Sequence, residues 1–441
     1  LVMVLGMVPM ASASSAYNVK LTPTTPDESK LSTAIQQNKF KLQNGEEAYA
    51  DSDTVRAIVI FEGEGAVPAA LKSTGVATQR AVAAASKTLT AQHSRIKTAI
   101  QSKAVSYDVK YEYTTLLNGM SADVKFGDLE KLASTAGVKE VYLANYYDEP
   151  VVMPSMDSAN DMTNITKVRD KDTGKGTVIA VIDTGITPGH EAFTAYDSML
   201  NKAAISKEQA EAAITKLGRG KYLSAKVPFS YDYYDKDNDA NDDVSGHDTH
   251  VSGIAAGCVL SDDGGYEFAG SAPGAQILAL KVFSSDPAER GTSSDVYLAA
   301  LEDAYTLGAD VINMSLGAQN GFVYDGIEEK VLNGIFTTLD DAGVICCIAA
   351  GNEGSMADGE SITGVPAGYV TSDYADYGVV GSPSTYDGNL SVASVDNAKY
   401  ASPAIEVDGA QIGYSDTVNA YNTLAGKTYD FVLVPGNGET S

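Results

Sequence analysis

The chain has 441 residues, of which 31 are basic and 58 acidic, and its net charge is −27. This length suggests two to four domains, and 44% hydrophobic with 20% charged residues is typical of a globular chain rather than a disordered one. The acidic balance argues against nucleic acid as a partner, because phosphate binding requires a basic face. Three cysteines, two of them adjacent at Cys346 and Cys347, argue against a disulfide framework.

The beginning of the chain predicts export. Residues 1–10 are apolar, and Ala11-Ser12-Ala13 follows as a small-x-small cleavage site, so we interpret residues 1–13 as the remnant of a signal peptide. The run is far shorter than the ~20 residues that span a membrane, and no later run reaches that length. We therefore expect a secreted protein without a membrane span, and a polar leader over residues 14–54.

The next segment, residues 55–150, has the pattern of a small α+β domain. Its expected elements are a strand (55–61), a helical stretch interrupted at Gly75 (69–103), two strands (105–114 and 119–124), a short helix (128–136) and a last strand (138–143). This order predicts a ferredoxin-like sandwich. The segment holds no histidine–carboxylate or cysteine cluster, so by itself it would be a binding or chaperone-like module.

Residues 151–400 have a different pattern. Their continuous apolar runs predict strands buried on both faces, as in parallel sheets covered by helices; these runs are 177–182, 276–283, 310–314 and 343–350. Helical periodicity lies between the runs, including a helix that Gly308 ends. We therefore predict a doubly wound α/β domain. A further helix begins near His247, with Val251, Ile254 or Ala255, and Cys258 expected on its inward face.

In such a sheet, ligands bind beyond the carboxyl ends of the strands. Asp183 follows the first run, Ser315-Leu316-Gly317 follows the run at 310–314, and Asn352 follows the run at 343–350. A buried aspartate requires a partner, and His247 is the natural one. Such a pair orients an imidazole so that its other nitrogen can take a proton from a serine, while an amide N–H can stabilise an oxyanion.

Four motifs carry a family resemblance. V-I-D-T-G at 181–185, H-D-T-H-V-S-G-I at 247–254, V-I-N-M-S-L-G at 311–317 and A-A-G-N-E-G at 349–354 resemble the successive signatures of subtilisin-like serine proteases, in that family's chain order. The resemblance covers residues 150–397. It implies a serine endopeptidase that forms an acyl-enzyme and acts on protein or peptide substrates.

The resemblance also implies roles for single residues. Asp183 would be the triad acid, His247 the general base and Asn352 the oxyanion-hole side chain. Ser315, Leu316 and Gly317 would pair with extended substrate backbone. The segment 55–150 resembles the family's inhibitory propeptide, which would act as an intramolecular inhibitor and be cleaved near residues 148–156.

The nucleophile motif of the family is absent from the chain. Gly291-Thr292-Ser293 is the one candidate, but it precedes Asn352, which is the wrong order, and Ser293 or Ser294 fits better as a helix N-cap. Residues 401–441 resemble the start of a β-rich protease-associated insert, as in lactocepin-like cell-envelope subtilases. We therefore expect the nucleophilic serine beyond Ser441, an inactive fragment, and cell-wall attachment through sequence that follows.

Two further departures concern the surroundings of His247. Asp248 stands where the family usually has glycine, and a charge there is expected to raise the pKa of His247. The interval between Asp183 and His247 holds an insertion at about 200–243, with a helical segment at 206–217 and an acidic run at 232–243.

Three features of the sequence also fit other kinds of site. D-T-G also fits aspartic proteases, but the second D-T-G, at 172–174, is too near to belong to a second lobe. His247 and His250 could hold zinc, yet H-E-x-x-H is missing, so we expect no metal there. The acidic run does not match the EF-hand template, but its oxygen ligands are compatible with a calcium site. No other cofactor is expected. The alternative function is a non-catalytic exported binding or adhesive protein on the same scaffold.

Overall fold

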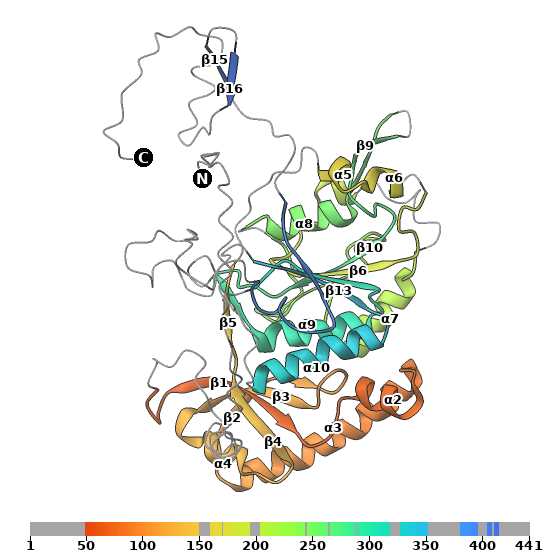
Figure 1. The fold of residues 1–441 in the computed structure, drawn as a ribbon. Helices are drawn as coiled ribbons and strands as arrows, with labels where there is room; N and C mark the ends of the chain where they lie inside the picture. The colour runs from red at the N-terminus through yellow and green to blue at the C-terminus, as the bar shows by residue number, and fades with distance from the viewer. Residues whose placement is uncertain are drawn as a thin grey trace, which may run out of the picture. The chain divides into compact units, whose positions relative to one another are not determined.

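The computed structural model describes residues 49–149, 159–169, 171–194, 203–242, 245–262, 265–286, 288, 290–317, 327–351, 380–395, 404–407 and 410–413. Two sheets dominate these residues (Figure 1). Both sheets belong to one compact unit, made of residues 25–154 and 164–396. The signal-peptide prediction, nearly all of the polar leader and Asn352 lie outside the described residues.

The first sheet is antiparallel and has the strand order β2-β3-β1-β4. Its strands are β1 (Thr54–Phe61), β2 (Tyr107–Tyr113), β3 (Gly119–Lys125) and β4 (Val138–Leu143). Its helices are α2 (Ala66–Thr74), α3 (Gln79–Ser102) and α4 (Leu129–Ala133), with a short 3-10 turn, η1 (Phe126–Asp128). The sequence predicted this element order, and the strand order is that of a ferredoxin-like sandwich.

Local sequence explains how the helices of this sheet begin and end. Gly75 ends α2 in the left-handed conformation, with φ of 72°, and the Thr78 hydroxyl accepts a hydrogen bond from Ala81 N at the start of α3. The predicted interruption at Gly75 therefore divides the alanine-rich stretch into two helices. The central strand β1 is buried on both faces, since Val59 packs toward α3 and Ile58 packs toward the second sheet.

The second sheet is parallel throughout and has six strands among the described residues. In spatial order they are β14 (Leu390–Val392), β13 (Ile345–Ala349), β12 (Val311–Met314), β6 (Val178–Asp183), β10 (Gln276–Lys281) and β7 (Phe229–Asp232). Each of the four apolar runs overlaps one of these strands, β6 ending one residue beyond its run, so the predicted α/β fold is confirmed. The carboxyl ends of β6 and β12 therefore meet at one edge of the sheet.

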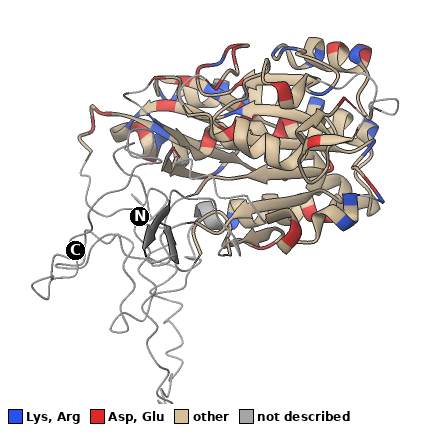
Figure 2. Ribbon diagram, turned by 90° about the horizontal axis from the view of Figure 1, so that it is seen from above, with Lys and Arg blue, Asp and Glu red and all other residues tan. Residues whose placement is uncertain are grey.

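Helices cover both faces of the parallel sheet (Figure 1). They are α8 (His247–Ala256) on one face and α9 (Ser294–Thr306) and α10 (Ile327–Asp341) on the other. α9 also contacts β2, and α10 contacts α2 and β4, so these two helices lie between the sheets. Figure 2 shows acidic and basic residues interspersed along the described part of the ribbon.

The remaining elements are short. They are β5 (Tyr146–Asp148), α5 (Ala159–Met162), α6 (Ile165–Arg169), η2 (Glu191–Phe193), α7 (Lys207–Leu217), β8 (Cys258–Leu260), β9 (Tyr266–Ala269), β11 (Gly291–Ser293), β15 (Ala404–Val407) and β16 (Ala410–Gly413). The helix predicted at 206–217 is α7, which Ser206 and Gln209 cap reciprocally. β15 and β16 form an antiparallel hairpin that belongs to a second unit.

The expected inward face of the helix after His247 is correct in part, since Val251 and Ala255 pack against the core beside β6 and β10. The buried residues of the helix are Asp248, Ser252, Gly253 and Ala256, whereas Val251, Ile254 and Ala255 are half-buried. Cys258 is buried, but it lies in β8 beyond the end of the helix. Small and polar residues of α8 are thus the fully buried ones where the helix packs on β6.

Candidate active site

The site is centred on Asp183, the last residue of β6. Its side chain is fully buried, and Oδ1 accepts a hydrogen bond from Thr184 N at 2.7 Å. The same oxygen lies 2.7 Å from Nδ1 of His247, the first residue of α8. The structure thus brings together two residues that are 64 positions apart in the sequence, as the motifs predicted.

Thr184 fixes the position of α8 relative to the carboxyl end of β6. Its hydroxyl oxygen accepts a hydrogen bond from Asp248 N at 3.0 Å, and its O–H donates to Asp242 Oδ2 at 3.0 Å. Gly246 precedes the helix with φ of 74°, a conformation that favours glycine. The His247 side chain is 12% exposed, so its ring is held on the Asp183 side and reaches solvent on the other.

The electrostatic surroundings favour a protonatable imidazole. Burial lowers the pKa of His247. The hydrogen bond and charge of Asp183, together with the charges of Asp242 and Glu149, raise it by more, so the net shift is upward. Burial also lowers the pKa of His250, and the neighbouring His247 charge lowers it further. The pair therefore has the electrostatics of a base oriented by a carboxylate.

The expected role of Asp248 requires correction. Its side chain is fully buried, and Ser252 Oγ donates to its Oδ1 at 2.6 Å. Burial raises the pKa of Asp248 well above the ordinary value, and the charge of Asp183 raises it further. The upward shift of the His247 pKa comes from Asp183, Asp242 and Glu149, not from a charged Asp248.

The residues after β12 reach the same edge of the sheet. Leu316 is buried, and Asn313 Nδ2 donates to Ser315 Oγ at 3.0 Å. A Cβ atom at Gly317 would lie 2.7 Å from the carbonyl oxygen of Ser382, so this close approach requires glycine. Their proposed pairing with substrate stays a prediction, as does the role of Asn352, which lies outside the described residues.

A short strand pair beside the site was not predicted from the sequence. β5 pairs antiparallel with β11, with Tyr147 opposite Thr292, and Glu149 N donates to Arg290 O at 3.1 Å. Tyr147 is 2% exposed and packs edge-on against Tyr297 of α9. The segment after the first sheet is therefore held as an extended strand that leads toward the acidic surroundings of Asp183.

The N-cap prediction for Ser293 and Ser294 is correct in position only. Ser293 is the N-cap residue of α9, but its hydroxyl donates to Asp295 Oδ1 at 2.6 Å and caps no backbone amide. Ser294 Oγ instead accepts a hydrogen bond from Asn145 N at 3.0 Å. The Ser294 side chain thus helps to hold the segment that contains β5, whereas Ser293 lies opposite Tyr146 in the β5–β11 pair.

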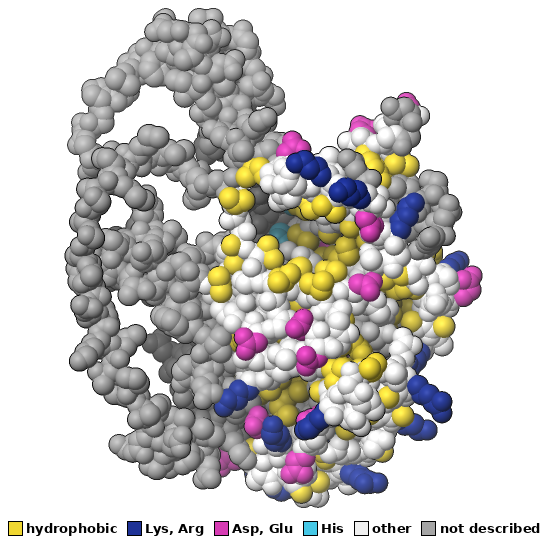
Figure 3. All heavy atoms as spheres, turned by 45° about the vertical axis from the view of Figure 1, so that its right-hand side comes forward, with side chains coloured by type: hydrophobic (Ala, Val, Ile, Leu, Met, Phe, Trp, Pro, Cys, Tyr) yellow, Lys and Arg dark blue, Asp and Glu magenta, His cyan; other side chains and the backbone are white. Residues whose placement is uncertain are grey.

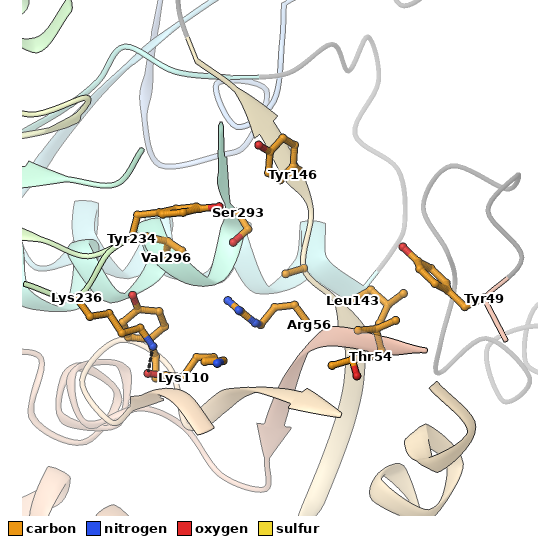
Figure 4. Close-up of a pocket in the computed structure, with 13 residues that line it drawn as sticks. Tyr49, Thr54, Arg56, Lys110, Leu143, Tyr146, Tyr234, Lys236, Ser293 and Val296 are labelled. Atoms are coloured by element: carbon orange, nitrogen blue, oxygen red, sulfur yellow. Dashed lines mark hydrogen bonds between the residues drawn. The ribbon is translucent and has the colours of Figure 1, made fainter. Parts of the chain in front are cut away.

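Two cavities flank β5 and β11. One, of about 300 Å³, is lined mainly by acidic residues and by Thr184; its charged lining residues are Glu149, Asp235, Asp237, Asp239, Asp242 and Lys281. The other, of about 530 Å³, lies between the two sheets, and Arg56, Lys110, Tyr146, Lys236 and Ser293 line it (Figure 4). Figure 3 shows a histidine side chain at the bottom of a hollow bordered by hydrophobic side chains.

The acidic run at 232–243 is only partly an open acidic loop. Asp232 is buried and bonded to Lys281, and Asp242 Oδ1 accepts from Ser245 N at 3.1 Å. Within the described residues, no group of three histidine, cysteine or acidic side chains is arranged to hold a metal ion. The calcium expectation stays a prediction. None of the helices in the described part of the chain is sufficiently long and apolar to cross a membrane.

Comparison with known proteins identifies the family. A profile described as the subtilase family matches residues 174–431, which is more than half of the chain. The chain belongs to the subtilase family. This subtilase is 34% identical over 308 residues to the PIII-type proteinase of Lactococcus lactis subsp. cremoris, a match that covers 68% of this chain and 15% of the relative.

A second relative is the C5a peptidase of Streptococcus pyogenes, 32% identical over 279 residues, with 62% of this chain and 23% of the relative covered. The subtilase chain thus spans less than a quarter of the length of either relative. Among solved structures, the epidermin leader peptide processing serine protease of Staphylococcus aureus matches 77% of this chain and 69% of its own, with a TM-score of 0.45 and 17% identity.

Proposed function

We propose that this subtilase is the amino-terminal part of a secreted serine endopeptidase. The observation that carries the proposal is the 2.7 Å contact between His247 Nδ1 and Asp183 Oδ1 at the carboxyl end of a parallel sheet. With Nδ1 bound to the carboxylate, Nε2 is the nitrogen available to take a proton from a serine hydroxyl. The names of the relatives, a proteinase and a peptidase, support the same function.

In this mechanism His247 accepts the serine proton as the oxygen attacks the peptide carbonyl, and later gives it to the leaving amine. Asp183 keeps the imidazole oriented and stabilises its charged form. The amide N–H of Asn352 donates to the tetrahedral oxyanion, an interaction worth on the order of 10²–10³ in kcat in the subtilisin case from which this magnitude is taken. Ser315, Leu316 and Gly317 offer backbone to an extended substrate.

The nucleophile is proposed to lie beyond Ser441. In the described part of the chain, the hydrogen-bond partner of the His247 ring is Asp183, and none of these bonds joins it to a serine. Ser293, the one serine in a Gly-Thr-Ser sequence, donates to Asp295 at the start of α9 instead. The 441-residue chain should therefore bind but not cleave peptides.

The segment 55–150 is proposed to act as an inhibitory propeptide. Three contacts to α9 support this role: Arg56 pairs with buried Asp295 at 2.8 Å, Tyr113 O–H donates to Asp295 O at 2.8 Å, and Glu302 accepts backbone hydrogen bonds from residues 114–117. β5 then lies along β11 as a bound peptide would. Cleavage near 148–156 would free this strand, and sequence after Ser441 would attach the enzyme to the cell wall.

Labelling with a serine-directed fluorophosphonate tests the proposal. The 441-residue chain should not be labelled, whereas the same chain with its natural continuation should be labelled stoichiometrically. His247→Ala should abolish that labelling. His190→Ala is the matched control, because His190 caps η2 by accepting from Ala192 N at 3.2 Å and its ring contacts Phe193. Labelling of the 441-residue chain would contradict the placement of the nucleophile, and an unlabelled extended chain would favour the non-catalytic alternative.

A further inference from the structure

Two carboxyl groups are buried side by side at the start of α8. Asp183 and Asp248 each have a fully buried side chain, and each has one oxygen, Oδ2, without a hydrogen-bond partner among the described residues. Asp248 follows His247 directly, and its backbone N–H is bound to Thr184, the residue after Asp183. If both of these buried carboxyl groups were ionised, they would repel each other strongly and both would be poorly solvated.

The contacts of the two groups differ in a way that decides which one ionises. Asp183 Oδ1 receives two N–H groups, from Thr184 and His247. The carboxyl of Asp248 has a serine hydroxyl, Ser252 Oγ, at 2.6 Å, and no cation bonded to it among the described residues. A hydroxyl can accept from a carboxylic O–H over the same distance at which it donates to a carboxylate, so the Ser252 contact accommodates a protonated Asp248.

We propose that Asp248 is an uncharged carboxylic acid in the folded chain, so that the catalytic centre combines one carboxylate, Asp183, with a second carboxyl group that keeps its proton. Asp248 is a positioning residue that acts through His247. It ties the first turn of α8 to Thr184 and Ser252 without adding a negative charge beside the base. The proton comes from solvent when the chain folds, since an exposed aspartate is ionised at neutral pH.

The charged and titratable groups around the pair are consistent with this assignment. Asp183 faces Asp248 from β6, Asp242 from the loop before α8, and the Gly185 amide from the turn after β6. Both carboxylates disfavour a charge on Asp248, whereas the amide and the Ser252 hydroxyl favour one, and burial outweighs these two hydrogen bonds. His247 already has Asp183, Asp242 and Glu149 as negative neighbours. A fourth negative charge would raise the pKa of His247 further, and the protonated form of an imidazole cannot act as a base.

The proposal rests on Asp183 and His247 being the catalytic pair, but its test uses no activity, so it can fail while the proposed function stands. The substitution is Asp248→Asn, which keeps the shape and removes the proton-binding site. A folded state that holds a proton lost on unfolding loses stability as pH rises. The unfolding equilibrium constant of the wild type, divided by that of the variant, should therefore rise up to tenfold per pH unit between pH 5 and pH 7.

The matched control is Asp303→Asn. Asp303 is also buried, but both its oxygens bind Arg219, at 2.7 and 2.9 Å, and it accepts the Tyr233 hydroxyl. Because the guanidinium stays charged throughout this range, the control should weaken the fold by the same factor at every pH. A wild-type to Asp248→Asn ratio that stays constant from pH 5 to pH 7 would overturn the proposal.

A second measurement covers the case in which the variant folds poorly. Four histidines in the whole chain make the imidazole resonances assignable by single substitutions in NMR spectra. In the wild type, the Asp248 carboxyl carbon should show the chemical shift of a protonated acid at pH 6, and the His247 titration should be unchanged in Asp248→Asn. An ionised carboxyl signal at pH 6, or a fall in the His247 pKa in the variant, refutes the assignment.

Discussion

Glu302 of α9 binds the backbone of the segment 49–149, and a substitution there measures how much this contact contributes to stability. Its side chain is buried and accepts hydrogen bonds from the backbone N–H groups of Thr114, Thr115, Leu116 and Leu117, at 2.5–3.1 Å. These four residues lie in the connection between β2 and β3. Burial raises the pKa of Glu302, and the four amides oppose that shift by stabilising the ionised form.

In Glu302→Gln a single amide oxygen replaces two carboxylate oxygens, and an NH₂ group faces backbone donors. About two of the four N–H groups then lose their acceptor. Each buried unpaired donor costs about 1–3 kcal/mol, and since two of the four residues are only half-buried we expect a loss of about 2–4 kcal/mol. Glu130→Gln, at an exposed position of α4, is the matched control and should change stability by less than ~0.5 kcal/mol.

Chemical unfolding followed by tyrosine fluorescence measures the loss, because the chain has 25 tyrosines and no tryptophan. Hydrogen exchange locates it, since the amides of residues 114–117 should exchange faster in Glu302→Gln than in the wild type. Equal stability of Glu302→Gln and Glu130→Gln, or unchanged exchange at these four amides, would refute the reasoning. Such a result would mean that solvent replaces the carboxylate without cost.

Two further predictions concern titrating groups. Asp183→Asn should lower the pKa of His247 in an NMR titration, because the hydrogen bond and charge of Asp183 are the main causes that raise it; an unchanged value would contradict the pairing. Burial lowers the pKa of Lys226 to about 7, so the unfolded chain binds more protons and wild-type stability should rise from pH 7 to pH 9. Lys226→Met should remove that rise and exposed Lys216→Met should keep it, and equal pH slopes in the two variants would rule out a titrating Lys226.

Continuous apolar runs were sufficient to predict the parallel sheet. The strand at 178–183 consists of six consecutive residues with no outward-facing polar side chain before Asp183, and such a run is stable only when both faces are covered. Because parallel strands place their carboxyl ends at one edge, the sequence also predicted that Asp183 and Ser315 would arrive at the same side. The contact with His247 followed from motif order rather than from periodicity.

The burial of Asp248 in α8 could not be predicted from the same kind of pattern. Hydropathy places Val251 and Ile254 or Ala255 on the inward face, and Val251 and Ala255 do pack against the core, but the fully buried positions include Asp248 and Ser252. Short-range pattern contains no information on how closely a helix approaches its sheet. Here the helix is fixed by Thr184 and by His247, and these polar contacts determine its rotation.

By itself, then, the sequence determined the alternation of elements, the two kinds of sheet and the acid–base pair, because each depends on local periodicity or on a motif. Only the tertiary structure decided that β5 lies on β11, that Glu302 binds the β2–β3 connection, and that Asp248 is buried beside Asp183. These contacts join residues that are widely separated in the chain, or involve a side chain, that of Asp248, whose burial the sequence pattern does not predict. Their energies depend on burial and on neighbouring charges, which exist only after the chain has folded.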